Sequence, residues 1–331
     1  MRGAGLDPES TLLMIILLPL GLYLAFINGA NSNFKGLATL YGSNVWDYRT
    51  AARIGAACIL LGGLASLVLA PGLISLFSSE HVPPAQRDTL ALAVIATAAA
   101  IVTTATWLGL PVSTTHALTG GLIGVSLVAD SDASAFIPRL AALVVPLAIS
   151  PFLAAMLSAA SISLANLARA RTRCETMGRA EQNPVLLERL HMLSGCAVSV
   201  ARAVNDVPKF AGAMVLAGLS DAINILLVAA IMSAGALFAG ARVARTISVQ
   251  ISHLAAQVAP PANFTTAAIV FLASLTGLSV ATTQVSVGSI IGAGISNRSA
   301  NWRLIGAILT SWLVILPLSG LVAATIFRAA T

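Results

Sequence analysis

The chain has 331 residues, of which 57% are hydrophobic and only 9% are charged. Soluble domains carry roughly 25% charged residues, so this composition excludes an ordinary soluble domain and predicts an all-α integral membrane protein. The net charge of +6 comes from Lys and Arg residues that cluster in a few polar loops, so it does not indicate a nucleic-acid partner.

Apolar segments long enough to span or half-span a bilayer are predicted at residues 11–28, 52–77, 89–108, 111–129, 137–168, 192–204, 208–238, 263–280, 285–296 and 302–327. The first resembles a cleaved signal peptide in length, but only Arg2 precedes it, against Asp7 and Glu9, so we expect a retained helix. Several segments are short, or are interrupted by Gly, Pro or Asn. This pattern is typical of broken or re-entrant helices.

A polar loop divides these segments into two sets. The loop, residues 169–190, contains five arginines and three acids, and the positive-inside rule places it in the cytoplasm. We therefore expect an N-terminal repeat at 1–168, a cytoplasmic linker at 169–190 and a C-terminal repeat at 191–331, all in the plasma (inner) membrane.

Two pairs of polar stretches relate the two sets to each other. Residues 28–36 and 202–209 both follow apolar runs, and both place an Asn four residues before a Lys. Residues 111–124 align without gaps on residues 279–292, with six of the fourteen positions identical. Two motifs in the same order at similar spacing indicate an internal repeat, and we expect two inverted repeats with a site where they meet.

The residue types of these four stretches suit an anion. Hydroxyl groups at a helix start cap free backbone amides, and the helix end carries partial positive charge. Two lysines buried in hydrocarbon repel each other unless an anion lies between them. The purely structural alternatives are that the hydroxyl groups form hydrogen bonds between helices and that each lysine extends its charged end to the membrane interface. The predicted substrate-binding residues are Asn31, Lys35, Ser113, Thr114, Thr115, Asn205, Lys209, Thr282 and Thr283.

Two further residues are candidates for coupling. Asp206 is the only acid in the four stretches, and it is able to pair with a lysine, bind a cation, carry a proton or simply cap a helix. Residues 205–209, with Asp206 and Pro208, have the pattern of a helix N-terminus. His116 stands where Gln284 stands in the other set, and it serves either as a proton relay or as a packing residue.

These motifs resemble the PiT family of inorganic phosphate transporters, which includes sulfate permeases. The family signature, roughly G-A-N-D-V-A-N-A in each half, is similar to residues 29–36 and 203–210, and a second signature, P-V-S-T-T-H, is intact at 111–116. The resemblance implies a secondary transporter with a tetrahedral oxyanion between the two halves. Ser32 replaces the first signature Asp, and Lys35 and Lys209 replace the second Asn of each signature, as in the sulfate-permease branch. A fixed ammonium can supply the charge that a bound sodium ion supplies in sodium-coupled members.

We therefore predict a secondary-active symporter of an inorganic oxyanion, with sulfate favoured over phosphate and with coupling to protons. Sulfate has only acceptors, which lysines, amides and hydroxyls suit, whereas phosphate also brings a hydroxyl that needs an acceptor, and Asp206 is the only charged one. The first alternative is a sodium-coupled inorganic phosphate transporter. An anion channel and a membrane enzyme acting on phosphorylated lipid are alternatives of other classes. We expect no enzyme activity, no cofactor, no metal site and no nucleic-acid partner. The chain contacts membrane lipid, and the sequence leaves a homodimer open.

Overall fold

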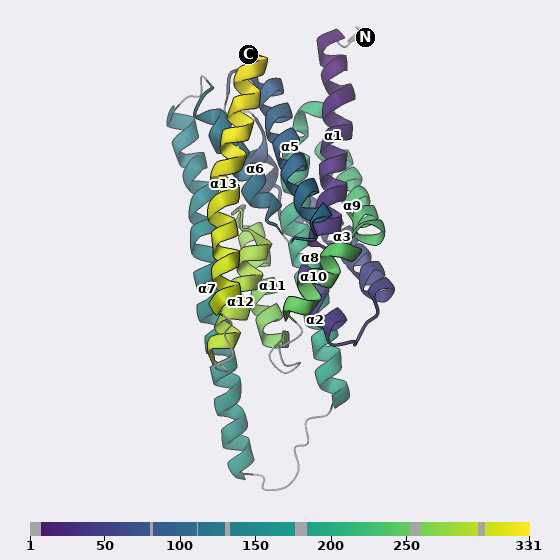
Figure 1. Ribbon diagram of the computed structural model, residues 1–331, viewed down its shortest axis with the longest axis vertical. Coiled ribbons are helices and arrows are strands. Elements are labelled where there is room, and N and C mark those ends of the chain that lie inside the picture. Colours follow the sequence, from purple (N-terminus) through teal and green to yellow (C-terminus); the bar gives the residue numbers. More distant parts are fainter. Residues whose placement is uncertain are drawn as a thin grey trace.

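The computed structural model describes residues 8–79, 82–110, 112–129, 133–175, 184–251, 259–296 and 302–331. The described residues form helices and no strands, so the all-α prediction is confirmed. Figure 1 shows an elongated bundle with both chain ends at the same end of the molecule.

The first set of helices comprises α1 (Pro8–Ser32), α2 (Phe34–Gly42), α3 (Tyr48–Leu69), α4 (Gly72–Phe77), α5 (Pro84–Trp107), α6 (Thr114–Ser126) and α7 (Ala133–Glu175). The second set comprises α8 (Pro184–Ala213), the 3-10 turn η1 (Val215–Ala217), α9 (Asp221–Phe238), α10 (Ala241–Ile251), α11 (Ala259–Leu275), α12 (Thr282–Ser296) and α13 (Trp302–Ala330). Six stretches in the described part are long and apolar enough to cross a membrane, as expected of an integral membrane protein.

Helices α6 and α12 are too short to cross. They have 13 and 15 residues, so each reaches roughly 20 Å at about 1.5 Å per residue, against roughly 30 Å of hydrocarbon. The Ser/Thr motif lies at the start of each helix, since Ser113 is the N-cap of α6, Thr114 and Thr115 are its first residues, and Thr282 and Thr283 begin α12. These are the half-length helices that the sequence predicts, although their inverted relation stays a prediction.

Each short helix packs on the long last helix of the other set (Figure 1). A Cβ added at Gly124 of α6 would lie 2.1 Å from the Gly320 carbonyl oxygen of α13, and one added at Gly292 of α12 would lie 2.0 Å from the Ala155 carbonyl oxygen of α7. Side chains are absent at these points because the two backbones touch. The two sets of helices are therefore interlocked.

One helix boundary predicted from the sequence differs from the structure. Helix α8 continues through Pro208, whereas the sequence pattern predicts a helix start there, so that prediction is wrong. Proline removes one backbone hydrogen bond, but residues 201–213 are buried among other helices, which keep the helix continuous. The predicted linker at 169–190 stays a prediction; within it, α7 extends to Glu175 and α8 begins at Pro184, and residues 176–183 lie outside the described part.

Candidate functional site

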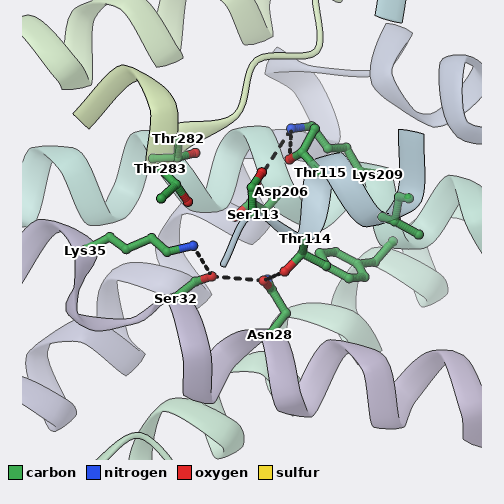
Figure 2. Close-up of a pocket in the computed structure, with 12 residues that line it drawn as sticks. Asn28, Ser32, Lys35, Ser113, Thr114, Thr115, Asp206, Lys209, Thr282 and Thr283 are labelled. Carbon is green, nitrogen blue, oxygen red and sulfur yellow. Dashed lines mark hydrogen bonds and ion pairs between the residues drawn. The ribbon is translucent and has the colours of Figure 1, made fainter. Parts of the chain in front are cut away.

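The four polar stretches of the sequence converge on one narrow cavity between the two sets of helices (Figure 2). Helices α1, α2, α6, α8 and α12 all contribute to it. Its lining consists of Asn28, Ser32, Lys35, Ser113, Thr114, Thr115, Leu118, Asp206, Lys209, Phe210, Thr282 and Thr283. Eight of these residues are predicted site residues, and two of them, Lys35 and Thr283, are 248 positions apart in the sequence.

Lys35 reaches the cavity from the start of α2. Its Nζ donates to Ser32 Oγ at 2.9 Å and to the Val112 carbonyl oxygen at 2.7 Å. An ammonium has three N–H groups, so one donor remains for a ligand. Figure 2 shows the lysine extending towards the hydroxyl groups of the cavity.

Lys209 lies in α8 and is 1% exposed. Its Nζ donates to Thr115 Oγ1 at 3.1 Å, to the Val280 carbonyl oxygen at 2.8 Å and to Asn205 Oδ1. These three acceptors use all three N–H groups of the ammonium. Lys209 lines the cavity, and its hydrogen bonds tie α8 to the first turn of α6 and to the segment that precedes α12.

Asn31 and Asn205 do not line the cavity, although the sequence predicts that both bind substrate. Asn31 donates to Thr106 Oγ1 at 2.9 Å and to the Leu110 carbonyl oxygen at 3.0 Å, and it accepts from the Val112 amide at 3.0 Å. Asn205 donates to Ser274 Oγ at 2.9 Å and accepts from Lys209. Both side-chain amides hydrogen-bond to helices and segments next to the cavity, and neither forms part of the cavity lining.

The hydroxyl groups at the start of α6 divide into two kinds. Thr114 Oγ1 donates to Asn28 Oδ1 at 2.7 Å, so its proton is already used within the protein. Ser113 caps α6 by accepting from the His116 amide at 3.3 Å, and Thr115 accepts from Lys209. The protons of Ser113 and Thr115 stay free to point at a ligand.

The start of α12 offers two more hydroxyl groups. Thr282 Oγ1 is buried and has no hydrogen-bond partner among the described residues, which is costly unless a ligand or water supplies one. Thr283 lies next to it in the cavity (Figure 2). The N-termini of α6 and α12 also add partial positive charge, because their first amides have no partner within the helix.

Asp206 carries the only carboxylate of the cavity lining. Its Oδ2 lies 3.5 Å from Arg202 Nη1, and its Oδ1 lies 3.7 Å from Lys209 Nζ. All three side chains project from one face of α8, at spacings of three and four residues. Asp206 thus lies in mid-helix, not at a helix cap, and it is placed between two buried cations.

His116 lies behind the cavity and joins α6 to α12. Gln284 Nε2, which can only donate, lies 2.9 Å from His116 Nε2, and His116 Nδ1 lies 2.7 Å from Ser113 Oγ. Nε2 therefore accepts and Nδ1–H donates, so both nitrogens of a neutral ring are in use. The structure does not place His116 in the cavity lining.

Five residues around the site are not among the site residues predicted from the sequence. Asn28, Ser32, Leu118 and Phe210 line the cavity, and Arg202 lies behind Asp206. The four-residue spacing from Asn28 to Ser32 and from Arg202 to Asp206 is a signal that could have indicated shared helix faces. Leu118 and Phe210 carry no such signal, because apolar residues surround them in sequence.

The balance of charge and donors determines what the cavity can hold. Two buried cations, Arg202 and Lys209, and the half-buried Lys35 together exceed the one carboxylate by two charges. The free donors are hydroxyl protons and one ammonium N–H. A small oxyanion with several acceptor oxygens matches this arrangement. No three His, Cys, Asp or Glu residues gather into a metal cluster within the described ranges.

Comparisons with known proteins find relatives that are described as phosphate transporters. The profile of the phosphate transporter family matches residues 28–323. The chain is 28% identical over 328 residues to a probable low-affinity inorganic phosphate transporter of Mycobacterium bovis, covering 94% of this chain and 76% of that protein. A protein of Bacillus subtilis with the same description is 24% identical over 323 residues, which covers 93% of this chain and 94% of that protein.

One solved structure shares the fold. It is described as the sodium-dependent phosphate transporter, and it superimposes with a TM-score of 0.84 at 23% sequence identity, covering 96% of this chain and 99% of the solved chain. The same arrangement of helices is thus retained where fewer than a quarter of the residues are identical. The comparisons contain phosphate transporters and do not support the predicted preference for sulfate.

Proposed function

Because the chain belongs to the phosphate transporter family, we propose that it carries inorganic phosphate across the membrane as a secondary-active transporter. The observation that carries the proposal is the shared cavity, where Lys35, the hydroxyl groups of two helix starts and the charge of Lys209 converge. A tetrahedral oxyanion can accept from several of these donors at once. The descriptions of the relatives favour phosphate over sulfate as that anion.

Sodium is the coupling ion that we propose, in place of the proton expected from the sequence. The solved structure with this fold is described as sodium-dependent. Proton coupling through His116 finds less support, because hydrogen bonds to Gln284 and Ser113 use both nitrogens of its ring. The oxygen atoms around Lys209 already surround an ammonium, so a coupling sodium ion has to bind at other oxygen atoms.

The test is uptake of labelled phosphate into proteoliposomes, with sodium and proton gradients imposed separately. We expect the sodium gradient to accelerate uptake and the proton gradient to have little effect. Phosphate uptake that follows only the proton gradient would contradict sodium coupling while leaving phosphate transport intact. Absence of phosphate uptake under every gradient would contradict the function itself.

A second measurement separates a carrier from the other classes. Phosphate preloaded inside the vesicles should stimulate uptake of labelled phosphate, because a carrier returns faster when it is loaded. A channel does not show this stimulation. A membrane enzyme acting on phosphorylated lipid would release phosphate from lipid vesicles, and we expect no release.

A further inference from the structure

The donors of the cavity outnumber its acceptors. Two oxygen atoms of the lining are already occupied by donors within the protein: Asn28 Oδ1 accepts from Ser32 Oγ at 3.0 Å and from Thr114 Oγ1 at 2.7 Å, and Ser32 Oγ accepts from Lys35. A hydroxyl group that donates its proton to an anion does not present a lone pair in the same direction, so it cannot also accept a hydrogen bond from that anion. The carboxylate of Asp206 is therefore the strongest acceptor that faces the cavity.

The ion pairs of Asp206 leave its lone pairs available. The distances of 3.5 Å to Arg202 and 3.7 Å to Lys209 exceed the usual length of roughly 2.7–2.9 Å for a charge-assisted hydrogen bond. A carboxylate has about four lone-pair sites, and no described hydrogen bond to Asp206 other than these ion-pair contacts fills them. Each carboxylate oxygen thus faces one cation and keeps further lone-pair sites for a ligand.

Arg202 makes this carboxylate compatible with an anion site. Its side chain is 0% exposed, and none of its guanidinium nitrogens has a hydrogen-bond partner among the described residues. Burying an arginine without hydrogen bonds is costly, so its charge must be balanced nearby, and Asp206 is the acid within reach. Arg202 in turn cancels the charge of Asp206, which would otherwise repel the substrate.

We propose that Asp206 accepts the hydrogen bond from the protonated oxygen of hydrogen phosphate, that Arg202 positions Asp206 for this contact, and that the pair excludes sulfate. Hydrogen phosphate carries at least one O–H group at neutral pH. Sulfate carries none, so each of its oxygens meets the carboxylate acceptor to acceptor, and the two negative groups repel. A site built to pair with a substrate O–H rejects an analogue that lacks it, because its own polar group then stays unpaired. The inference rests on the proposed transport of phosphate.

The experiment compares Asp206→Asn, Asp206→Glu and wild type in proteoliposome uptake of labelled phosphate, with sulfate or arsenate as competitor. Arsenate carries an O–H as phosphate does. The readout is the ratio of the sulfate inhibition constant to the phosphate KM. We expect this ratio to fall by about tenfold or more in Asp206→Asn, where one carboxylate oxygen becomes a donor, while arsenate competition changes little. Asp206→Glu should retain the exclusion of sulfate, because it retains the carboxylate.

Arg202 has its own matched pair. Arg202→Lys keeps the charge and should keep the selectivity ratio, whereas Arg202→Met should lower it even though Asp206 is present. A merely structural arginine would lower the amount of folded protein in both variants without changing the ratio. If a variant does not transport, the rise in melting temperature of the detergent-solubilised protein on addition of phosphate, compared with sulfate, reports the same preference.

The outcomes separate this inference from the proposed function. Wild-type phosphate uptake with an unchanged selectivity ratio in Asp206→Asn overturns the inference and leaves phosphate transport standing. Lack of phosphate uptake by the wild type overturns both. A lowered ratio in Asp206→Asn and Arg202→Met, with both conservative variants like wild type, supports the assignment.

Discussion

The two halves build the same corner of the cavity with different chemistry. In both, an Asn anchors the helix, a Lys follows four residues later, and the lysine donates to the carbonyl oxygen of a valine before a short helix: Val112 for Lys35, and Val280 for Lys209. One turn earlier the halves diverge. The first half has the neutral pair Asn28 and Ser32, and the second has the ion pair Arg202 and Asp206.

The difference teaches how a repeated motif becomes a selective site. Each half contributes a net charge of about +1 to the cavity: Lys35 in the first half, and Arg202 and Lys209 minus Asp206 in the second. An anion between the halves is therefore attracted from both sides. Only the second half offers a carboxylate, and only the first leaves an ammonium N–H unused. Both halves thus line the cavity with hydroxyl groups, and the second half adds a carboxylate acceptor.

The largest expected effect comes from replacing either lysine by Met. Lys35→Met should lower phosphate uptake about 100-fold, because it removes a donor to the ligand, and should lower the melting temperature less than Lys209→Met does, because only Ser32 and Val112 lose a donor. Lys209→Met should abolish uptake and also destabilise the protein by about 3 kcal/mol, because Thr115, Asn205 and Val280 lose their shared donor. Uptake and melting of detergent-solubilised protein measure both. Equal stability of the two variants would contradict the division of roles.

In both halves a glycine of the short helix lies against the backbone of a long helix, and substitution of either glycine should destabilise the protein. Gly124→Ala and Gly292→Ala place a Cβ about 2 Å from a backbone carbonyl oxygen that cannot rotate away. We expect each to destabilise the protein by about 1–3 kcal/mol. Gly121→Ala is the matched control, because its nearest neighbour would lie at 3.4 Å. Melting curves that leave Gly124→Ala and Gly121→Ala indistinguishable would argue against the tight packing of α6 on α13.

Ser32→Asp gives the first half the carboxylate of the second without its arginine. The new charge lies beside Lys35 and removes one net positive charge from the cavity, so we expect the KM for phosphate to rise about tenfold. Ser32→Asn, which is similar in size and neutral, is the control for volume. A KM that rises equally in both variants would show that space, rather than charge, sets the effect.

The smallest effect should come from His116→Gln, which makes the two short helices alike at this position. His116 bonds to Ser113 and Gln284 and is not in contact with the cavity, so we expect uptake to change less than about threefold. The dependence of uptake on pH should also stay as in wild type. If uptake by wild type depends on pH and uptake by His116→Gln does not, His116 is a coupling residue after all.

The sequence was most informative where a pattern occurred twice. Lys35 and Lys209, with the Ser/Thr starts at 113–115 and 282–283, could be assigned to one site because each pair follows its own apolar run at matching positions. The all-α membrane fold followed from the scarcity of charge. Neither result needed side-chain geometry.

Geometry decided the rest. The sequence cannot show that Lys209 uses every N–H within the protein while Lys35 keeps one, since the acceptors come from segments far apart. It predicts that Asn31 and Asn205 bind substrate, which stays a prediction, but it cannot show that their amides donate to Thr106 and Ser274, far away in the sequence. Pro208 was misread as a helix start because local propensity is overridden when neighbouring helices bury the chain.

The interlocked packing of the short helices has a consequence for synthesis of the chain. Helix α6 lies on α13, and Ser319 Oγ donates to the His116 carbonyl oxygen at 3.4 Å across 203 residues of sequence. Helix α6 therefore leaves the ribosome long before α13 is made. The glycine face of α6 has no packing partner on that side until α13 is inserted. The packing around α6 is therefore completed only once α13 has been made, later than Thr283, the last residue in the chain that lines the cavity.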